Sequence, residues 1–460
     1  MDYRQFIASK FLKVPPCGFH ADDRMIPSKL FDWQKEIVRW ATSRGRAAIF
    51  AACGLGKTAM QLAWAEQVVN HTNKPVIIMA PLAVSQQTVA EGCKFGIDVK
   101  SIRGMGSVTD PAIYIINYEM LAHVNPDLFG GVVLDESSIL KALIGKTKMR
   151  LIETFQSVPY RLCCTATPAP NDHAELGNHA EFLGIMRTPE MLSTWFVNDG
   201  FQVGHWRLKG HAVESFWQWV SSWAVSLNKP SDIGDFSDDG FILPELNTVK
   251  HKIPVDETDF ANGLLIKTSA SSASTIKRDM RKTLALRVAK AAEICTKQDG
   301  PCIVWCELND ESTALVRSIP GAVEITGSMK PEEKERRMID FTNGKIKTLV
   351  TKPKIAGFGM NWQHCNNMIF VGCSYSFEAR YQAIRRCWRF GQTKPVNDNV
   401  ILAGQESKIF DAVAEKERKY MEMERSMSGT FGQYNDITNT TIAKEVYAGK
   451  EAVITPAFLR

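Results

Sequence analysis

Short apolar runs that alternate with helical patterns are the feature that most restricts how this 460-residue chain can fold. Several runs are β-branched, and the segments between them repeat their apolar residues at helical spacing. This alternation is typical of βαβ units, in which helices cover both faces of a parallel sheet. The runs occupy residues 47–52, 76–80, 113–116, 132–134 and 162–164, and then 302–306, 323–326, 348–351, 368–371 and 400–402. Two groups of runs predict two α/β lobes in tandem.

The segment between the two groups has a different composition. Five tryptophans gather there: Trp195, Trp206, Trp217, Trp219 and Trp223. Helical spacing joins Phe216, Val220, Trp223 and Leu227. This spacing favours a helical insertion packed inside the first lobe, and stacking of the rings on bases is the alternative. We expect a first lobe at residues 1–250 with the insertion at about 188–240, a linker at 251–283, a second lobe at 284–405, and a C-terminal helical extension and tail at 406–460.

Composition and charge restrict the kinds of partner that the chain can bind and the cellular compartment in which we expect it. The formal net charge of +5 permits a nucleic-acid partner without demanding one, because a local basic face matters more than the total. No run approaches the roughly 18 apolar residues of a membrane span, and the charged N-terminus is unlike a secretory signal. The 11 cysteines show no CxxC spacing, so free thiols in a reducing cytoplasm are the simplest interpretation.

A glycine-rich loop follows the first apolar run. Residues 51–58, Ala-Ala-Cys-Gly-Leu-Gly-Lys-Thr, fit the pattern A-x4-G-K-T and precede a helical pattern. Gly54 and Gly56 would let backbone N–H groups approach phosphate at a helix N-terminus. Lys57 would reach the β- and γ-phosphates of a nucleoside triphosphate, and the Thr58 hydroxyl would bind Mg²⁺. The alternative is a glycine-rich turn without a ligand.

Two adjacent acids, Asp135 and Glu136, follow the apolar run at residues 132–134. Alone, such a pair is most often a surface turn. Beside a phosphate loop, the first acid suits Mg²⁺ and the second suits activation of the attacking water. The sequence therefore predicts Asp135 as a metal ligand, Glu136 as the general base, and hydrolysis of the triphosphate.

Further motifs follow in a fixed order along the chain. They are Phe31-Asp-Trp-Gln34, Met79-Ala-Pro81-Leu-Ala-Val-Ser85, Asn117-Tyr118-Glu119, Cys164-Thr165-Ala-Thr167-Pro168, Gly357-Phe-Gly359-Met-Asn361-Trp362, and Gln382-Ala-Ile-Arg-Arg386-Cys-Trp-Arg389-Phe-Gly-Gln392. With the loop and the two acids, they make the chain from about residue 31 to 423 resemble superfamily 2 helicases. The resemblance is strongest to Swi/Snf-type DNA translocases and phage-encoded DEAD/DEAH-like helicases. It implies two RecA-like lobes, with ATP and Mg²⁺ as cofactors.

The resemblance also implies roles for individual residues. Gln34 would hydrogen-bond the adenine edge, although Trp33 beside it also suits the core of an amphipathic helix. A further set of residues would contact nucleic acid or couple hydrolysis to strand movement. These residues are Pro81, Ser85, Asn117, Tyr118, Thr165, Thr167, Gly357, Gly359, Asn361 and Gln382. For residues 79–85 and 117–121, a plain strand-to-helix turn is the competing interpretation.

The sixth motif of the family implies two arginine fingers, Arg386 and Arg389, which would neutralise charge on the γ-phosphate. A basic, solvated helix face is the alternative. Two departures from the family stand out, because Ser137-Ser138 replace the commoner Ala-His or Gly-His, and Ala51-Ala52 replace the usual Asp-Glu. The first departure leaves Ser138 as the candidate link from the acids to the next motif.

The function that the resemblance implies is an ATP-dependent DNA translocase or helicase in viral or bacterial replication, recombination or repair. It would be a DNA-dependent ATPase in the cytoplasm of a bacterium or a virus-infected host cell, with replication or recombination proteins as candidate partners and no membrane partner. DNA binding should be sequence-independent and should weaken with salt. The motifs do not exclude RNA. The alternatives are an ATP-gated DNA-binding or scaffold protein and the motor subunit of a restriction-type complex.

Overall fold

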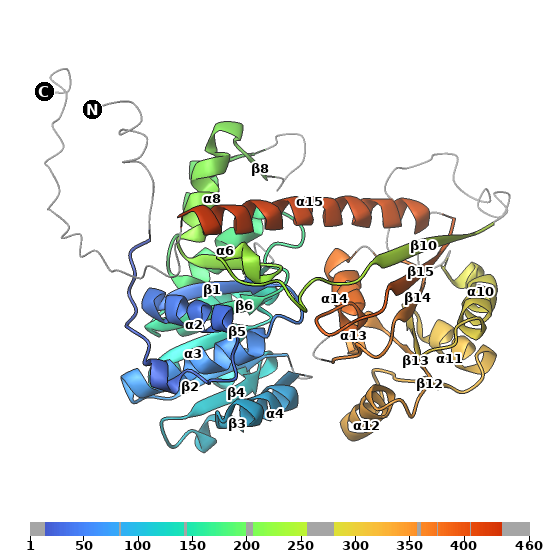
Figure 1. The fold of residues 1–460 in the computed structure, drawn as a ribbon, viewed down its shortest axis with the longest axis horizontal. Coiled ribbons are helices and arrows are strands. Elements are labelled where there is room, and N and C mark those ends of the chain that lie inside the picture. The colour runs from blue at the N-terminus through green and yellow to red at the C-terminus, as the bar shows by residue number, and fades with distance from the viewer. Residues whose placement is uncertain are drawn as a thin grey trace, which may run out of the picture.

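The computed structural model describes residues 14–81, 84–141, 145–198, 206–254, 280–356, 360–374, 376–404 and 406–434. Within these ranges the chain forms two large parallel sheets, each flanked by helices (Figure 1). The predicted α/β class with two tandem RecA-like lobes is confirmed.

The first lobe is built on a seven-stranded sheet with the order β3-β4-β2-β5-β6-β1-β9. Every pairing in it is parallel, and all the side chains of β2 and β5 are buried, as expected for strands covered on both faces. The strands are β1 (Arg46–Ala51), β2 (Val76–Ala80), β3 (Val99–Ser101), β4 (Ile113–Asn117), β5 (Gly131–Asp135), β6 (Tyr160–Thr165) and β9 (Ala224–Leu227). The helices of this lobe include α2 (Asp32–Arg44), α3 (Lys57–Thr72), α4 (Ser85–Phe95), α5 (Lys146–Phe155) and α6 (Leu176–Leu183).

The second lobe is built on a six-stranded parallel sheet with the order β10-β15-β14-β11-β13-β12. Its strands are β10 (Leu246–Ile253), β11 (Cys302–Cys306), β12 (Ala322–Glu324), β13 (Thr348–Thr351), β14 (Asn367–Val371) and β15 (Val396–Ala403). Its helices are α10 (Leu284–Thr296), α11 (Asn309–Ser318), α12 (Pro331–Thr342), α13 (Pro353–Ala356) and α14 (Phe377–Cys387).

Strand β10 pairs with β15 and so belongs to the second sheet, although the expected boundary placed residues up to 250 in the first lobe. The reason is its position at the edge of the sheet. Edge strands do not need an apolar run, and none of the side chains of β10 is fully buried. Its pattern therefore did not mark it as part of a sheet.

The tryptophan-rich segment packs inside the first lobe, as the spacing favoured. It contains α7 (Thr188–Trp195), the antiparallel pair β7 (Phe196–Asn198) and β8 (Trp206–Leu208), and α8 (Val213–Ser221). The rings of Trp195 and Trp219 stack with 4.8 Å between centroids, and both side chains are buried. The expected helix through Leu227 was wrong, because the chain leaves α8 and enters β9 beside β1. Backbone pairing with β1 outweighs a helical spacing in the side chains.

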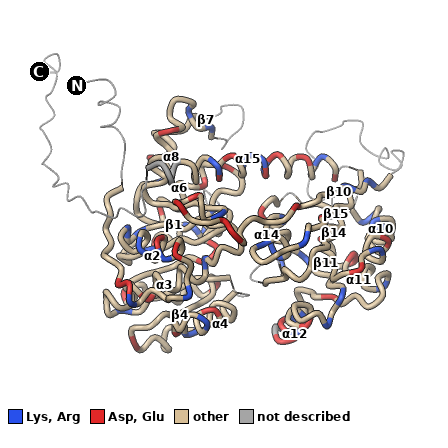
Figure 2. The backbone as a smooth tube through the Cα atoms, in the orientation of Figure 1, with Lys and Arg blue, Asp and Glu red and all other residues tan. Residues whose placement is uncertain are grey.

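The C-terminal extension contains one long helix, α15 (Glu406–Tyr434), which crosses both lobes (Figure 1). It begins after β15 and packs further along against α8 and β9. Figure 2 shows acidic and basic positions interspersed along it, while Tyr420, Met423 and Met427 on another side are buried. Within the described part of the chain, no helix combines the length and the apolarity needed to cross a bilayer.

Candidate active site

The phosphate-loop pattern lies between β1 and α3, in the context that the sequence predicted. Gly54 and Gly56 have φ angles of 95° and 74°, where only glycine is unstrained. Neighbouring atoms also approach closely, because a Cβ on Gly56 would lie 2.4 Å from Gln34 Nε2, and one on Gly54 would lie 2.9 Å from Phe390 N. Lys57 Nζ donates to the carbonyl of Ala51 at 2.7 Å, so its ammonium group lies across the loop.

Replacing Gly54 with alanine should therefore weaken the predicted nucleotide binding. A left-handed backbone costs an alanine about 1–2 kcal/mol, and the new methyl group also meets Phe390 of the second lobe. We expect a lower unfolding temperature and a weaker ATP affinity, both measured against the wild-type protein, the latter by titration calorimetry. Gly106→Ala is the matched control, because a Cβ there meets no atom within 4 Å. Wild-type ATP affinity in Gly54→Ala would contradict this account of the loop.

The two predicted acids lie at the carboxyl end of β5, at the same edge of the sheet as the loop. Asp135 Oδ1 accepts a hydrogen bond from the backbone N–H of Glu136 at 3.1 Å. Burial raises the pKa of Asp135, and it raises the pKa of Glu136 to about 7 against the opposing charges of Lys57 and Arg386. Glu136 also has a φ of 55°, and such strained backbone clusters at functional sites. The carboxylate of Glu136 is thus held close to two cations.

The link from the acids to the next motif runs through Glu136 itself. Thr165 Oγ1 donates to Glu136 Oε2 at 3.5 Å. Ser137 contacts His179 Nε2 at 3.1 Å, inside the first lobe. Ser138, a candidate for that link, is buried, and among the described residues the hydrogen bond between this region and Thr165 is made by Glu136.

A second-lobe acid, Glu378 on α14, meets the first lobe at this point. Thr167 Oγ1 donates to Glu378 Oε1 at 3.5 Å, and Lys141 forms an ion pair with the same carboxylate. Sequence reasoning missed both Lys141 and Glu378. Glu378 lies one helical turn before Gln382, and this spacing from a motif residue is the sequence feature that could have indicated its place in the site.

Arg386 and Arg389 lie at the end of α14 and just beyond it. Both donate through Nη1 to the carbonyl of Met360, at 3.2 and 3.1 Å, and Arg386 Nη2 donates to Gln382 Oε1 at 2.8 Å. Arg386 is only 4% exposed, so the solvated-face interpretation is wrong for it. Burial, with the nearby charge of Arg386, lowers the pKa of Arg389 to about 10. Arg389 Nε is buried without a hydrogen-bond partner among the described residues, and an anion would satisfy such a donor.

The phosphate loop and the arginine segment touch across the lobes. Gly54 lies against Phe390 and the Cβ of Arg389, and Cys53 Sγ lies 3.9 Å from Gln382 Oε1. The ring of Phe390 stacks on Phe241 at 4.7 Å between centroids. Neither aromatic residue was predicted, although Phe390 directly follows Arg389 in the sixth motif. The two halves of the candidate site are thus brought together.

Gln34 is buried next to the loop. Its Oε1 accepts from the N–H of Phe31 at 3.0 Å, and its Nε2 donates to the carbonyl of Leu55 at 3.1 Å. In this structure the amide therefore holds the start of α2 against the loop. Trp33 is 3% exposed, so its assignment to the core is correct.

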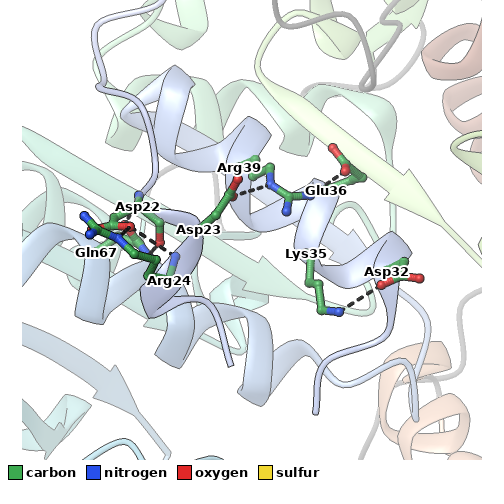
Figure 3. A network of polar contacts seen from close by, with 8 residues as sticks. All are labelled: Asp22, Asp23, Arg24, Asp32, Lys35, Glu36, Arg39 and Gln67. Carbon is green, nitrogen blue, oxygen red and sulfur yellow. Dashed lines mark hydrogen bonds and ion pairs between the residues drawn. The ribbon is translucent and has the colours of Figure 1, made fainter. Parts of the chain in front are cut away.

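A polar network ties α2 to the phosphate-loop helix α3 (Figure 3). Arg39 on α2 pairs with Asp23 at 2.7 Å, and Gln67 on α3 accepts from the N–H of Asp22 at 2.8 Å and donates to its carbonyl at 3.0 Å. Exposed ion pairs stabilise little, but the buried Gln67 amide satisfies both backbone groups of Asp22. The network fixes how α2, and hence Gln34, lies beside the loop.

The predicted nucleic-acid and coupling residues fall into separate groups. Ser85, the first residue of α4, and Asn117, the last residue of β4, meet through a 3.0 Å hydrogen bond, and Pro81 directly follows β2. Tyr118 is buried and donates to the carbonyl of Asp135 at 2.8 Å, which makes it a support of the acids. Asn361 Oδ1 accepts from the N–H of Gln363 at 3.3 Å. Gly357 and Gly359 lie outside the described residues.

Two parallel α/β lobes meet at a glycine-rich loop with the phosphate-loop pattern and at an arginine pair, the arrangement that the resemblance to helicases implies. Residues 285–391 match the family model of the helicase conserved C-terminal domain. The second lobe is therefore similar to that domain, which bears out the resemblance to superfamily 2 helicases.

Two further proteins are similar to this chain. Putative protein p41 of Acyrthosiphon pisum secondary endosymbiont phage 1 is 25% identical over 435 residues, which is 81% of this chain and 92% of that protein. The SWI2/SNF2 ATPase core of Sulfolobus solfataricus, solved in complex with dsDNA, is 18% identical. That match covers 91% of this chain and 96% of the other, with a TM-score of 0.43.

Proposed function

We propose that this helicase-type protein is an ATP-driven DNA motor of the Swi/Snf type, a translocase or helicase that acts in viral or bacterial replication, recombination or repair. The observation that carries the proposal is the contact between Gly54 of the phosphate loop and Arg389-Phe390 of the second lobe. A site divided between two lobes makes lobe closure part of the ATPase cycle. Movement of one lobe against the other is what a motor needs.

The site residues suit Mg-ATP. Gly54 and Gly56 would present backbone N–H groups to the phosphates, with Lys57 beside them. Thr58 and the buried Asp135 supply a hydroxyl and a carboxylate, the hard oxygen donors that Mg²⁺ prefers. When bound, Mg²⁺ would offset charge on the β- and γ-phosphates.

Hydrolysis would use groups from both lobes. Glu136 would accept a proton from the attacking water, and its pKa of about 7 suits a base near neutral pH. Arg386 and Arg389 would exchange the carbonyl of Met360 for the γ-phosphate and so stabilise its developing charge. Loss of that phosphate would return both arginines to the second lobe and relax the closed state.

Coupling to DNA would pass through the residues between the acids and α14. Thr165 and Thr167 bridge Glu136 and Glu378, so the state of the acid and the position of the second lobe are linked. Ser85 and Asn117 are the candidate first-lobe contacts to a DNA backbone, together with Pro81. Such contacts carry no sequence information, which supports sequence-independent binding.

The test is ATPase activity in the presence of single-stranded, duplex, forked and branched DNA, and of RNA. We expect DNA to raise kcat, with an apparent DNA affinity that falls linearly with salt on logarithmic axes. A triplex-displacement assay beside a fork-unwinding assay then separates translocation from strand separation. Failure of every polynucleotide to stimulate would remove the motor proposal and favour an ATP-gated scaffold. Activity only with an added nuclease partner would favour the motor subunit of a restriction-type complex.

A further inference from the structure

The long helix α15 is anchored in the second lobe by its first half. Ile409, Phe410 and Val413 are buried there. The guanidinium of Arg380 on α14 lies 5.1 Å from the centre of the Phe410 ring, and Lys250 on β10 pairs with Asp411 at 3.2 Å. The helix therefore follows the second lobe when that lobe moves.

The second half of α15 rests on the first lobe, and Tyr420 makes its most specific contact. The hydroxyl of Tyr420 hydrogen-bonds the carbonyl of Ala166, the residue between Thr165 and Thr167. It also lies 2.6 Å from Glu424 Oε1, one turn along the same helix. The backbone carbonyl of Ala166, in the predicted coupling motif, thus accepts a hydrogen bond from Tyr420, which lies outside the motifs found in the sequence.

The Tyr420 hydroxyl has one proton and two acceptors within reach, the carbonyl of Ala166 and Glu424 Oε1. Burial raises the pKa of Glu424 to about 7, and the hydrogen bond from Tyr420 opposes that rise. A glutamine at position 424 would keep a polar partner for the hydroxyl, and its amide could also donate to the Tyr420 oxygen while the hydroxyl proton goes to Ala166.

The same part of α15 covers the arginine-finger helix. A cavity between α14 and α15 is lined by Tyr381, Arg385, Trp388, Glu417, Tyr420 and Glu424. The guanidinium of Arg385 lies 5.1 Å from the Tyr381 ring centre and 4.6 Å from that of Trp388. Because Arg386 is the next residue, α15 lies against both the coupling motif and the helix that carries the predicted fingers.

We propose that Tyr420 is a positioning residue of the coupled ATPase, which fixes residues 165–167 through Ala166 and lets α15 transmit movement of the second lobe to Glu136. The inference rests on the proposed function and extends it to the C-terminal helix. Residues 165–167 touch Glu136 through Thr165 and Glu378 through Thr167. The contact of Tyr420 adds a third fixed point to this tripeptide, so its position depends on both lobes.

The experiment compares ATPase kinetics of the full chain with saturating DNA. In Tyr420→Phe we expect the DNA-stimulated kcat to fall about threefold to tenfold, with the KM for ATP little changed, since one hydrogen bond is lost outside the nucleotide site. Glu424→Gln should retain most of the stimulated kcat, because its amide still hydrogen-bonds Tyr420 and leaves the bond to Ala166 in place.

The matched control is Tyr114→Phe. Tyr114 is also buried, and its hydroxyl hydrogen-bonds Asp110 at 2.8 Å, on β4 and remote from α15. It should keep the wild-type stimulated kcat, which separates positioning from a general loss of stability. Equal losses in the two tyrosine variants, or full stimulation of Tyr420→Phe, would overturn the inference while the proposed function stands. Absence of stimulation in the wild-type protein would instead remove the proposed function and this inference together.

Discussion

Glu136→Gln is expected to lower the ATPase kcat by about 10²–10⁴-fold, the range typical of removing a general base. The amide cannot accept the proton of the attacking water. ATP should still bind, because the phosphate loop and Asp135 are unchanged. Steady-state kcat and the affinity for a fluorescent ATP analogue measure the two effects separately. Turnover and nucleotide affinity are measured separately because burial of Glu136 is also compatible with a structural role for this residue.

Glu153→Gln is the control for this prediction, since Glu153 is an exposed acid on α5 in the same lobe. It should leave kcat and nucleotide affinity at wild-type values. Wild-type turnover in Glu136→Gln would show that another group activates water. The assignment of the base would then be wrong, while the nucleotide site could remain.

Arg389→Ala is expected to lower kcat by about 10³-fold or more, the effect that arginine fingers have where they stabilise phosphoryl transfer. The KM for ATP should change far less, because the charge that the arginine stabilises develops in the transition state. Arg389 and Arg386 both donate to the carbonyl of Met360, so the two guanidinium groups lie at the same place in the second lobe. Single-turnover hydrolysis measures this effect without product release.

Arg336→Ala supplies the comparison, because Arg336 is an exposed residue of α12 that pairs with Glu333 on its own helix. It should leave single-turnover hydrolysis unchanged. If Arg389→Ala instead raised the KM and preserved kcat, Arg389 would be a ground-state contact. Its unpartnered Nε would then belong to nucleotide binding rather than to catalysis.

Much of the fold was predictable because parallel strands buried on both faces leave apolar runs in the sequence. The runs at residues 76–80 and 302–306 coincide with β2 and β11. Two strands at sheet edges, β9 and β10, escaped prediction for different reasons. β10 is exposed on much of its length, and β9 follows a helix whose apolar spacing continues through it. The position of β9 is determined by its backbone pairing with β1.

The candidate site was predictable where a motif encodes local geometry. The glycines at positions 54 and 56 adopt positive φ angles, as a phosphate loop needs, and the acids follow β5. Contacts between motifs were not predictable in this way. Ser138 was a candidate for the contact with the coupling motif, and the hydrogen bond that the structure contains joins Glu136 and Thr165. Lys141, Glu378 and Phe390 are part of the candidate site because the two lobes face one another there. A local sequence pattern contains no information about how the lobes face.

The amino-acid sequence by itself predicted two α/β lobes, a phosphate loop at Lys57, acids at positions 135 and 136, and an arginine pair at 386 and 389. Each of these depends on residues that are neighbours in the chain. Only the tertiary structure decided that Gly54 meets Phe390, that Glu378 pairs with Lys141, and that Tyr420 holds Ala166. Those contacts join residues more than 200 positions apart, as between Ala166 and Tyr420. Their existence depends on how two separately folded sheets pack, and helical or strand periodicity carries no information about that.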